Sequence, residues 1–549
     1  MANPLARRFY QQFLSGLSAV AKPLLWSVAI ALPAAALSDS VDTSGIDALR
    51  LQAEPYALTG HKIAIGQVEI GRPGQFGIDK VPAGLPMAVS QVFELDGPAV
   101  SDGFVQGHAA NVASVMISRD KWLRGVAPNA RLYAAAVGDL SESKGQPEEC
   151  ITAQHVALQN SGDVRAMNFS FGEPLSRDPR PNALLDGEAL LTHCIDWSSR
   201  VHKLLYVIAG NQGRGGIPIP TDNFNAINVA YSTRIDGEFV RVDYANLSSE
   251  PARVSYYGPE PESNVGTRRS ISLVAPGSNI EMFEPDGSRT VSSGTSFAAP
   301  HVVATVALLQ EFGDRQFRGN AENWSLDARE PLVMKSVILN SADKLQDTGD
   351  GNLLGMSRTL LDERGRSWKE SDAYSDQSIP LHKDLGVGHL NAFRAYTQFV
   401  GGQWSPGSVP AIGWSYSAVG DEGTDAQGGE VQGGDVQDYV FEQPLKAGSY
   451  ISATLTWERL VELNSADEYF DVGEDFTGRS LSNLDLYLLP ADSDDIRDSV
   501  WSSVSLEDSL EHIFIPIPER DRYKLRVVRQ SGSEETVPYS LSWWANTDS

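Results

Sequence analysis

Between residues 62 and 400 the chain alternates short apolar runs with longer stretches in which apolar residues recur at helical spacing. Apolar runs with few polar interruptions are typical of strands buried on both faces of a parallel sheet. Strands that alternate with helices predict an α/β fold in which helices cover both faces of that sheet. The predicted strands are residues 62–69, 131–136, 166–171, 204–209, 226–230 and 271–274, and the predicted helices are residues 108–117, 150–159, 190–202, 296–312 and 330–340, with a last helix that ends near residue 400.

The pattern changes beyond residue 400. Residues 401–437 are rich in Gly, Ser, Pro and Asp, which predicts a linker or long loops. From residue 438 short runs of alternating apolar and polar residues are separated by turn residues, which predicts a C-terminal all-β sandwich domain over residues 438–549. A chain of 549 residues is long enough for two such domains, and residues 61–400 are expected to form the other.

The N-terminus has the features of a signal peptide. Arg7, Arg8 and Lys22 precede an apolar stretch over residues 23–37, and residues 34–36 are three alanines that fit a cleavage site. The alternative is an uncleaved anchor, but the stretch is shorter than the roughly 20 residues that span a bilayer. Residues 1–36 are therefore predicted to be a signal peptide, which implies an extracytoplasmic protein without membrane insertion after cleavage. Residues 37–60 would form a short polar lead.

Charge and cysteine content exclude some functions. The net charge is −27, and such an acidic surface repels phosphate backbones, which argues against nucleic acid as a partner. The acidic loops could bind structural calcium or only keep the protein soluble, and no metal ligands are assigned from the sequence. Cys150 and Cys194 are too few for a disulfide scaffold. They form either one bridge or two buried free thiols.

One decapeptide carries the strongest chemical signal. Residues 293–302 read Ser-Gly-Thr-Ser-Phe-Ala-Ala-Pro-His-Val and open an apolar helical run, which places Ser296 at a helix N-terminus. Free N–H groups and the helix dipole favour developing negative charge there. Gly-Thr-Ser before a helix is by itself an ordinary N-cap. The whole string, however, resembles the nucleophile motif of the subtilisin-like serine peptidases, the subtilases.

The resemblance implies a histidine base and an acid upstream of the serine. Gly107-His108 before a helix with Val112-Ala113 resembles the subtilase histidine motif, although Asn111 replaces that motif's second histidine. Glu69 stands at the end of the first predicted strand, where subtilases have aspartate, and Gly71 follows as in the family. A glutamate can also accept a hydrogen bond from the imidazole and stabilise the imidazolium.

The same resemblance implies an oxyanion donor and a substrate-binding edge. Residues 206–213 are a buried strand that enters a Gly-Asn-Gln-Gly turn, and in subtilases this turn places an asparagine, here Asn211, at the oxyanion. The run Asn168 to Gly172 resembles the strand end that pairs with the substrate backbone. Candidate substrate-binding residues are Ser170, Phe171, Gly172 and Gly210. Asp79 and Asp102, on nearby loops, are the alternative triad acids.

The order Glu69, His108, Asn211, Ser296 is the subtilisin order. It implies a subtilisin-like fold and a serine endopeptidase that acts on protein or peptide substrates without a cofactor. The segment before residue 62 is too short for the usual folding pro-domain, which is expected to be absent. Two alternatives remain: a catalytically degenerate subtilase that binds peptides, and a peptide-maturation protease with one dedicated substrate. The sequence does not assign an oligomeric state.

Overall fold

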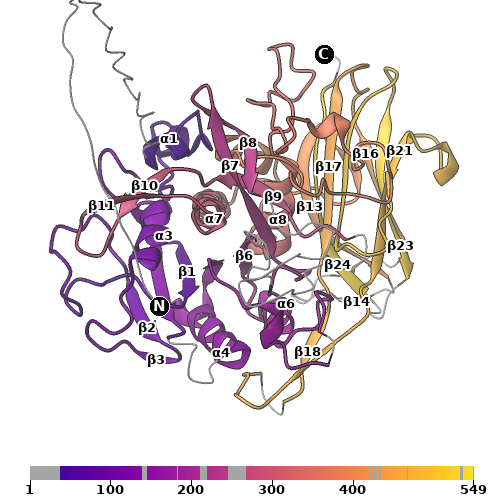
Figure 1. The fold of residues 1–549 in the computed structure, drawn as a ribbon. Coiled ribbons are helices and arrows are strands. Elements are labelled where there is room, and N and C mark those ends of the chain that lie inside the picture. The colour runs from indigo at the N-terminus through magenta and orange to yellow at the C-terminus, as the bar shows by residue number, and fades with distance from the viewer. Residues whose placement is uncertain are drawn as a thin grey trace, which may run out of the picture. The chain divides into compact units, whose positions relative to one another are not determined.

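The computed structural model describes residues 37–138, 145–181, 183–210, 219–244, 268–420, 423–424, 430–431, 434–465, 468–531 and 536–547. A parallel-dominated sheet forms the centre of the fold, with helices on both faces (Figure 1). Its strand order in the described residues is β3-β2-β4-β1-β5-β6-β7-β8, with β9 beside β7. The strands are β1 (Ala64–Glu69), β2 (Gln91–Glu94), β3 (Gly97–Pro98), β4 (Arg131–Ala136), β5 (Val164–Phe169), β6 (Leu205–Ala209), β7 (Ile227–Ile235), β8 (Glu238–Tyr244) and β9 (Leu273–Pro276).

The predicted α/β fold is therefore confirmed, and the apolar runs explain it. β1 and β5 are buried along their whole length, as expected for strands covered on both faces. β1 pairs in parallel with β4 and β5, and β5 pairs in parallel with β6. The carboxyl ends of these strands consequently meet at one edge of the sheet, which is where α/β folds usually bind ligands.

Two hydrophobic cores flank the sheet. On one face Ile65, Ala166 and Val207 pack with α3 (Gly107–Ile117) and α7 (Thr295–Arg318). On the other face strand residues pack with α4 (Gln146–Ala157) and α6 (Leu190–Val201). A disulfide between Cys150 and Cys194 joins α4 to α6, so the bridged alternative is the one that the structure contains. The remaining helical segments are α1 (Leu37–Val41), α2 (Ala48–Gln52), α5 (Gln159–Gly162), α8 (Pro331–Asn340), α9 (Ala392–Val400), η1 (Leu175–Arg177), η2 (Leu326–Arg329), η3 (Trp368–Glu370) and η4 (Ile496–Asp498).

The prediction of a polar lead over residues 37–60 is wrong. Within it, Val41, Ile46, Leu51 and Leu58 are at most 1% exposed and belong to the same core as α3 and α7. α1 and α2 have only five residues each, which is too short for apolar residues to recur at helical spacing. The sequence therefore contains no pattern from which their burial could be predicted. The predicted signal peptide, residues 1–36, lies outside the described residues.

A β-sandwich follows the α/β part of the chain. One sheet has the order β12-β16-β23-β20-β21 and the other β13-β24-β17-β22. Their facing side chains form a separate core that contains Tyr439, Leu455, Trp457, Leu525 and Trp543. The strands are β12 (Gly407–Val409), β13 (Ile412–Gly420), β16 (Val436–Phe441), β17 (Tyr450–Trp457), β20 (Asn483–Pro490), β21 (Trp501–Ser503), β22 (Leu510–Pro516), β23 (Tyr523–Ser531) and β24 (Thr536–Trp544). Three short hairpins complete the fold: β10 (Ile280–Phe283) with β11 (Arg289–Ser292), β14 (Gly423–Thr424) with β15 (Glu430–Val431), and β18 (Val461–Leu463) with β19 (Phe476–Gly478).

The predicted linker, residues 401–437, needs correction at its start. It contains β12 and β13, and β13 pairs with β24 from Ile412 to Gly420. The glycines and serines that suggested a loop lie here in a regular strand. β13 is a strand because its backbone pairs with β24 along its whole length. Trp414 on this strand is completely buried.

The sandwich is held to α8 through buried hydroxyl groups. All ten residues of α8 are buried, and α8 lies against β13, β17 and β24. Ser336 Oγ lies 2.8 Å from the hydroxyl oxygens of Ser540 and Ser542. The Asn340 side chain accepts hydrogen bonds from Ser452 Oγ at 2.9 Å and Thr454 Oγ1 at 3.1 Å. Alternating polar residues on these strands therefore face a helix and not solvent.

This interface gives a stability prediction. Asn340→Ala removes the acceptor for two buried hydroxyls and the donor to Gln398 Oε1 at 2.8 Å. We expect the free energy of unfolding to fall by about 1–3 kcal/mol, because the buried partners lose hydrogen bonds that water cannot replace. Chemical denaturation measures the change, with Gln346→Ala as the control because Gln346 is exposed. Equal losses in the two variants would contradict the assigned role of the interface.

Candidate active site

A carboxylate and an imidazole meet at the carboxyl edge of the sheet. Glu69 is the last residue of β1, and His108 lies in the first turn of α3. Glu69 Oε2 lies 2.6 Å from His108 Nδ1. The glutamate side chain is 3% exposed and the histidine side chain 42% exposed, so the acid lies behind the base. The far nitrogen of the ring, Nε2, is the one left for a substrate or a nucleophile.

Gln67 holds the carboxylate in this position. Its Nε2 donates to Glu69 Oε1 at 2.7 Å and to the Ala109 carbonyl at 2.9 Å. Successive residues of a strand point to opposite faces, so Ile65, Gln67 and Glu69 all face the side covered by α3. Gln67 was not among the site residues that the sequence predicted. The feature that could have identified it is a polar side chain two residues before Glu69, on the same face of a buried strand.

The charge of Glu69 changes the titration of His108. Burial by itself lowers the pKa of the imidazole, but the neighbouring carboxylate and the hydrogen bond to it outweigh burial, and the pKa of His108 is raised above its ordinary value. An imidazole with a raised pKa accepts a proton more readily. This arrangement suits a general base whose protonated form must be stabilised.

The alternative acids are engaged elsewhere. Asp79 accepts hydrogen bonds from Arg72 Nη1 at 2.7 Å and from Arg72 Nη2 at 2.8 Å, in a buried ion pair. Asp102 pairs with Lys80 at 2.6 Å near the surface. Both carboxylates order the loops between β1 and α3, and Glu69 is the acid that the structure brings to His108.

Ser296 lies in the first turn of α7, beside the end of β5. Its Oγ donates to the Ser170 carbonyl at 3.4 Å, while Ser170 Oγ donates to the Ser296 carbonyl at 2.9 Å. Asn168 Nδ2 in turn donates to Ser170 Oγ at 2.9 Å. The ring of Phe297, the next residue, lies 5.6 Å from the His108 ring, centroid to centroid. The serine and the histidine are therefore at the same edge of the sheet.

The loop before Ser296 is fixed by backbone contacts. Gly294 N donates to the Gly277 carbonyl at 2.9 Å, and Thr295 Oγ1 donates to the Gly210 carbonyl at 2.7 Å. A Cβ at Gly277 would lie 2.6 Å from the Gly294 carbonyl oxygen and 2.5 Å from Tyr231 Cβ. Only glycine fits this close approach, so the loop geometry depends on it.

The other predicted site residues have different outcomes. Gly210 is buried at the end of β6, next to the Ser296 loop, whereas Asn211 lies outside the described residues. Phe171 stacks on Phe169 at 5.0 Å between ring centroids, and Gly172 follows it. Asn111 stands where the subtilase motif has its second histidine. Its Nδ2 donates to the Phe283 carbonyl at 3.0 Å and so connects α3 to β10.

The acidic loops considered for calcium use their carboxylates internally. Asp347 accepts hydrogen bonds from the backbone N–H groups of Gly349, Gly351, Leu353 and Gly355. Asp494 pairs with both Lys524 and Arg526. In the described part of the chain no group of three or more His, Cys, Asp or Glu side chains is arranged to hold a metal ion.

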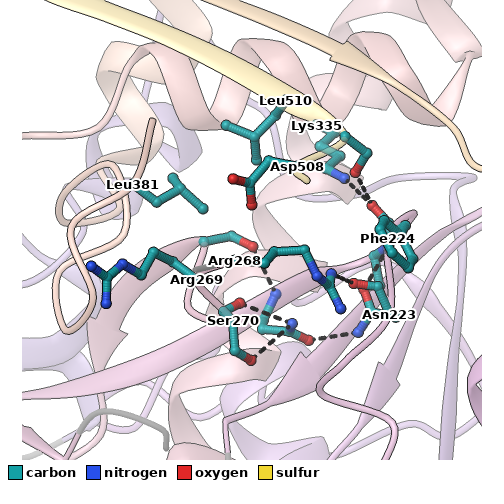
Figure 2. Close-up of a pocket in the computed structure, with 13 residues that line it drawn as sticks. Asn223, Phe224, Arg268, Arg269, Ser270, Lys335, Leu381, Asp508 and Leu510 are labelled. Carbon is teal, nitrogen blue, oxygen red and sulfur yellow. Dashed lines mark hydrogen bonds between the residues drawn. The ribbon is translucent and has the colours of Figure 1, made fainter. Parts of the chain in front are cut away.

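A small polar pocket lies between α8 and the start of β22 (Figure 2). Lys335 Nζ donates to the Phe224 carbonyl at 2.8 Å, and Arg268 Nη1 donates to the Asn223 carbonyl at 2.7 Å. Burial lowers the pKa of Lys335 to about 8 and raises the pKa of Asp508 to about 6. Lys335 and Arg268 thus donate hydrogen bonds to backbone carbonyls of the chain itself. The pocket is therefore part of the contact between the α/β part of the chain and the β-sandwich.

The geometry around His108 gives a prediction that does not depend on activity. Glu69→Gln should lower the pKa of His108 below its wild-type value, because burial then acts without the compensating carboxylate. NMR titration of the imidazole, assigned by comparison with His108→Ala, measures the shift. Asp102→Asn removes the same charge from a loop beside α3 and should leave the His108 titration unchanged. A shift of equal size in both variants would contradict the specific pairing with Glu69.

The chain is similar to known subtilases. A model described as the subtilase family matches residues 89–357, a span that contains His108 and Ser296 and begins after Glu69. Subtilisin DY of Bacillus licheniformis is 26% identical over 266 residues, which cover 48% of this chain and 81% of that protein. The alkaline protease of Alkalihalobacillus alcalophilus is 26% identical over 250 residues, 44% of this chain and 56% of that protein, so the match spans little more than half of that relative.

Among solved structures, the prenylagaramide maturation protease PagA is 20% identical with a TM-score of 0.38, over 61% of this chain and 92% of that chain. The part of the chain that the structure describes has no helix that is both long and apolar enough to cross a membrane. The family match and the related subtilisins agree: residues 89–357 of this chain belong to the subtilase family of serine peptidases.

Proposed function

We propose that this protein is a serine endopeptidase that hydrolyses peptide bonds with Ser296 as nucleophile, His108 as base and Glu69 as the orienting acid. The observation that carries the proposal is the 2.6 Å contact between Glu69 Oε2 and His108 Nδ1 at the edge where Ser296 lies. His108 Nδ1 keeps its proton and donates a hydrogen bond to the Glu69 carboxylate. This bond fixes the tautomer in which Nε2 carries no proton and can accept one from Ser296. Membership of the subtilase family supports the same reaction.

The reaction follows from these positions. Ser296 Oγ bonds to the carbonyl carbon of the scissile peptide while its proton passes to His108 Nε2, and the carbonyl oxygen becomes an oxyanion. Glu69 stabilises the imidazolium that forms. The C–N bond then breaks, the leaving amine takes the proton from His108, and an acyl group remains on Ser296. A water molecule, deprotonated by His108, releases the acyl group by the same sequence in reverse.

Two groups are proposed to hold the oxyanion: the backbone N–H of Ser296, at the N-terminus of α7, and the side chain of Asn211. The helix terminus supports the first, because its free N–H groups favour negative charge. The resemblance of residues 206–213 to the subtilase strand and turn supports the second. The backbone of Ser170, Phe171 and Gly172, together with Gly210, is proposed to bind the substrate as an added strand with little demand on side chains.

The location is proposed to be extracytoplasmic, with residues 1–36 as a signal peptide. The disulfide between Cys150 and Cys194 supports this, because such bridges persist mainly in oxidising compartments. Residues 61–400 are proposed as the peptidase domain and the β-rich remainder as an accessory domain. Protein or peptide substrates are expected, and the reaction as written uses only groups of the chain and water.

A peptide-binding subtilase without activity is the second candidate, motivated by the glutamate at position 69 and by Asn111. This candidate is less favoured because Asn111 donates a hydrogen bond to the Phe283 carbonyl, a structural contact that explains the residue without a loss of activity. A maturation protease with one dedicated substrate would share the chemistry but cleave few members of a mixed peptide library. Substrate profiling separates that case from general proteolysis.

Covalent labelling tests the nucleophile and the acid together. A fluorophosphonate probe should label wild-type protein on Ser296, and labelling should disappear in Ser296→Ala and in His108→Ala. Glu69→Gln should slow peptide hydrolysis by about 10⁴-fold, because an amide cannot hold the productive histidine tautomer. Asp102→Asn is the matched control and should retain wild-type rates. A wild-type protein that is never labelled, at any pH, would favour the peptide-binding candidate.

Asn211 has its own test. Asn211→Ala should lower kcat by about 10²–10³-fold, the usual effect of losing one oxyanion donor, with KM nearly unchanged because the donor acts mainly in the transition state. Steady-state kinetics with a peptide substrate measures both constants. Gln212→Ala, at the next residue, is the control. An unchanged kcat in Asn211→Ala would remove this residue from the mechanism.

A further inference from the structure

Two glutamates that the proposed chemistry does not use face each other behind the substrate-binding edge. Glu149 on α4 and Glu173, the residue after Gly172, are both completely buried. The two carboxyl groups lie close enough to interact directly, and Oε2 of Glu173 accepts no hydrogen bond from an N–H or hydroxyl donor within the described residues. Neither carboxyl oxygen of Glu149 accepts a hydrogen bond from an N–H or hydroxyl donor within the described residues. Glu173 Oε1 accepts one from Arg177 Nη1 at 3.2 Å.

Two buried carboxyl groups in contact cannot both be ionised without a large electrostatic cost, so one of them keeps a proton. Burial, and then the adjacent Glu173, raise the pKa of Glu149 well above its usual range. The charged groups that act on Glu149 are Glu173 and Glu148, which favour the protonated form, and Arg177, which opposes it. The protonated Glu149 carboxyl is then the donor that Oε2 of Glu173 would otherwise lack.

This pair connects a rigid helix to the segment proposed to bind substrate. Glu173 N donates to the Ile219 carbonyl at 2.9 Å, and Ile219 N donates to the Glu173 carbonyl at 3.1 Å. Ser170 to Gly172 therefore lie between the contacts of Ser170 with Ser296 and the contacts of Glu173. On the other side, Cys150 next to Glu149 is bonded to Cys194 on α6.

We propose that Glu149 is a positioning residue for the substrate: its carboxyl proton, donated to Glu173, holds the Ser170 to Gly172 segment in the geometry that pairs with a peptide. The inference rests on the proposed function, because the segment matters only if peptides bind there. When the pH rises, Glu149 releases this proton to solvent, two carboxylates face each other, and their repulsion disturbs the end of the substrate-binding segment. Peptide affinity consequently falls on the alkaline side.

The sign of the accompanying stability change follows from the raised pKa. The folded protein binds this proton more tightly than the unfolded chain does, so the stabilisation is complete below the ordinary glutamate pKa. It is lost progressively as the pH rises from there through the pKa of the folded state. Glu149→Gln replaces the titrating donor by an amide that donates to Glu173 at every pH and should remove both effects.

The test compares Glu149→Gln with wild type and with Glu148→Gln, which removes one charge from the same helix but leaves the pair intact. KM and kcat are measured with fluorescently labelled casein from acidic to alkaline pH. Wild type and Glu148→Gln should show a KM that rises on the alkaline side, and Glu149→Gln should show a flat KM. The acid limb of kcat should be the same in all three proteins, since it reports His108.

A second measurement, thermal unfolding in the Ser296→Ala background, separates this inference from the proposed function. The Tm of Glu149→Gln, relative to its parent, should increase by about 1 °C per pH unit through the titration range, because one proton is worth about 1.36 kcal/mol per unit. A Tm difference that does not change with pH overturns the shared proton. The same alkaline rise of KM in Glu149→Gln overturns the positioning role. Failure of the proposed function appears instead as casein cleavage that does not depend on Ser296.

Discussion

The parallel pairing of β1, β5 and β6 is the constraint on which the site depends. Because these strands run in one direction and are neighbours, their last residues, Glu69, Phe169 and Ala209, lie along one edge of the sheet. Glu69, the segment from Ser170 to Gly172 and Gly210 all lie at this edge. α3 and α7 begin at the same edge, so the His108 imidazole and the Ser296 hydroxyl, which lie in their first turns, come to this edge from the helices. No single loop has to reach across the fold.

The same geometry supports Glu69 as the proposed triad acid. A buried carboxylate is costly unless its oxygens are paired. Here Oε2 meets His108 and Oε1 accepts from Gln67, so each oxygen has a partner. Gln67 also binds the Ala109 carbonyl, which links the position of the acid to that of the helix carrying the base. The extra methylene of glutamate is thus accommodated by a neighbour two residues earlier on the same strand.

The elements that could be predicted are those encoded by local patterns. Fully apolar runs indicated the buried strands, and the string around Ser296 indicated the helix start. Features that depend on distant partners were missed. Val41 and Leu51 become core residues because distant elements, β10 beside α1 and α9 beside α2, pack against their helices, and β13 becomes a strand only beside β24. Ser452 and Ser540 resemble solvent-facing strand positions until α8 is placed against them. The sequence left the pairing of Cys150 and Cys194 open for the same reason.

Two titrations at one edge act in opposite directions. In the proposed mechanism His108 must lose its proton to serve as base, and its pKa is raised by Glu69, so activity would fall on the acid side. In the proposed positioning role Glu149 must keep its proton to hold Glu173, and its pKa is raised by burial and by Glu173, so peptide binding would weaken on the alkaline side. The two limits differ in kind: the first acts on proton transfer and the second on the substrate-binding backbone. A bell-shaped profile of kcat/KM would therefore have an acid limb that belongs to chemistry and an alkaline limb that belongs to the fold. The width of the active range would be set by how strongly the protein buries one pair of glutamates.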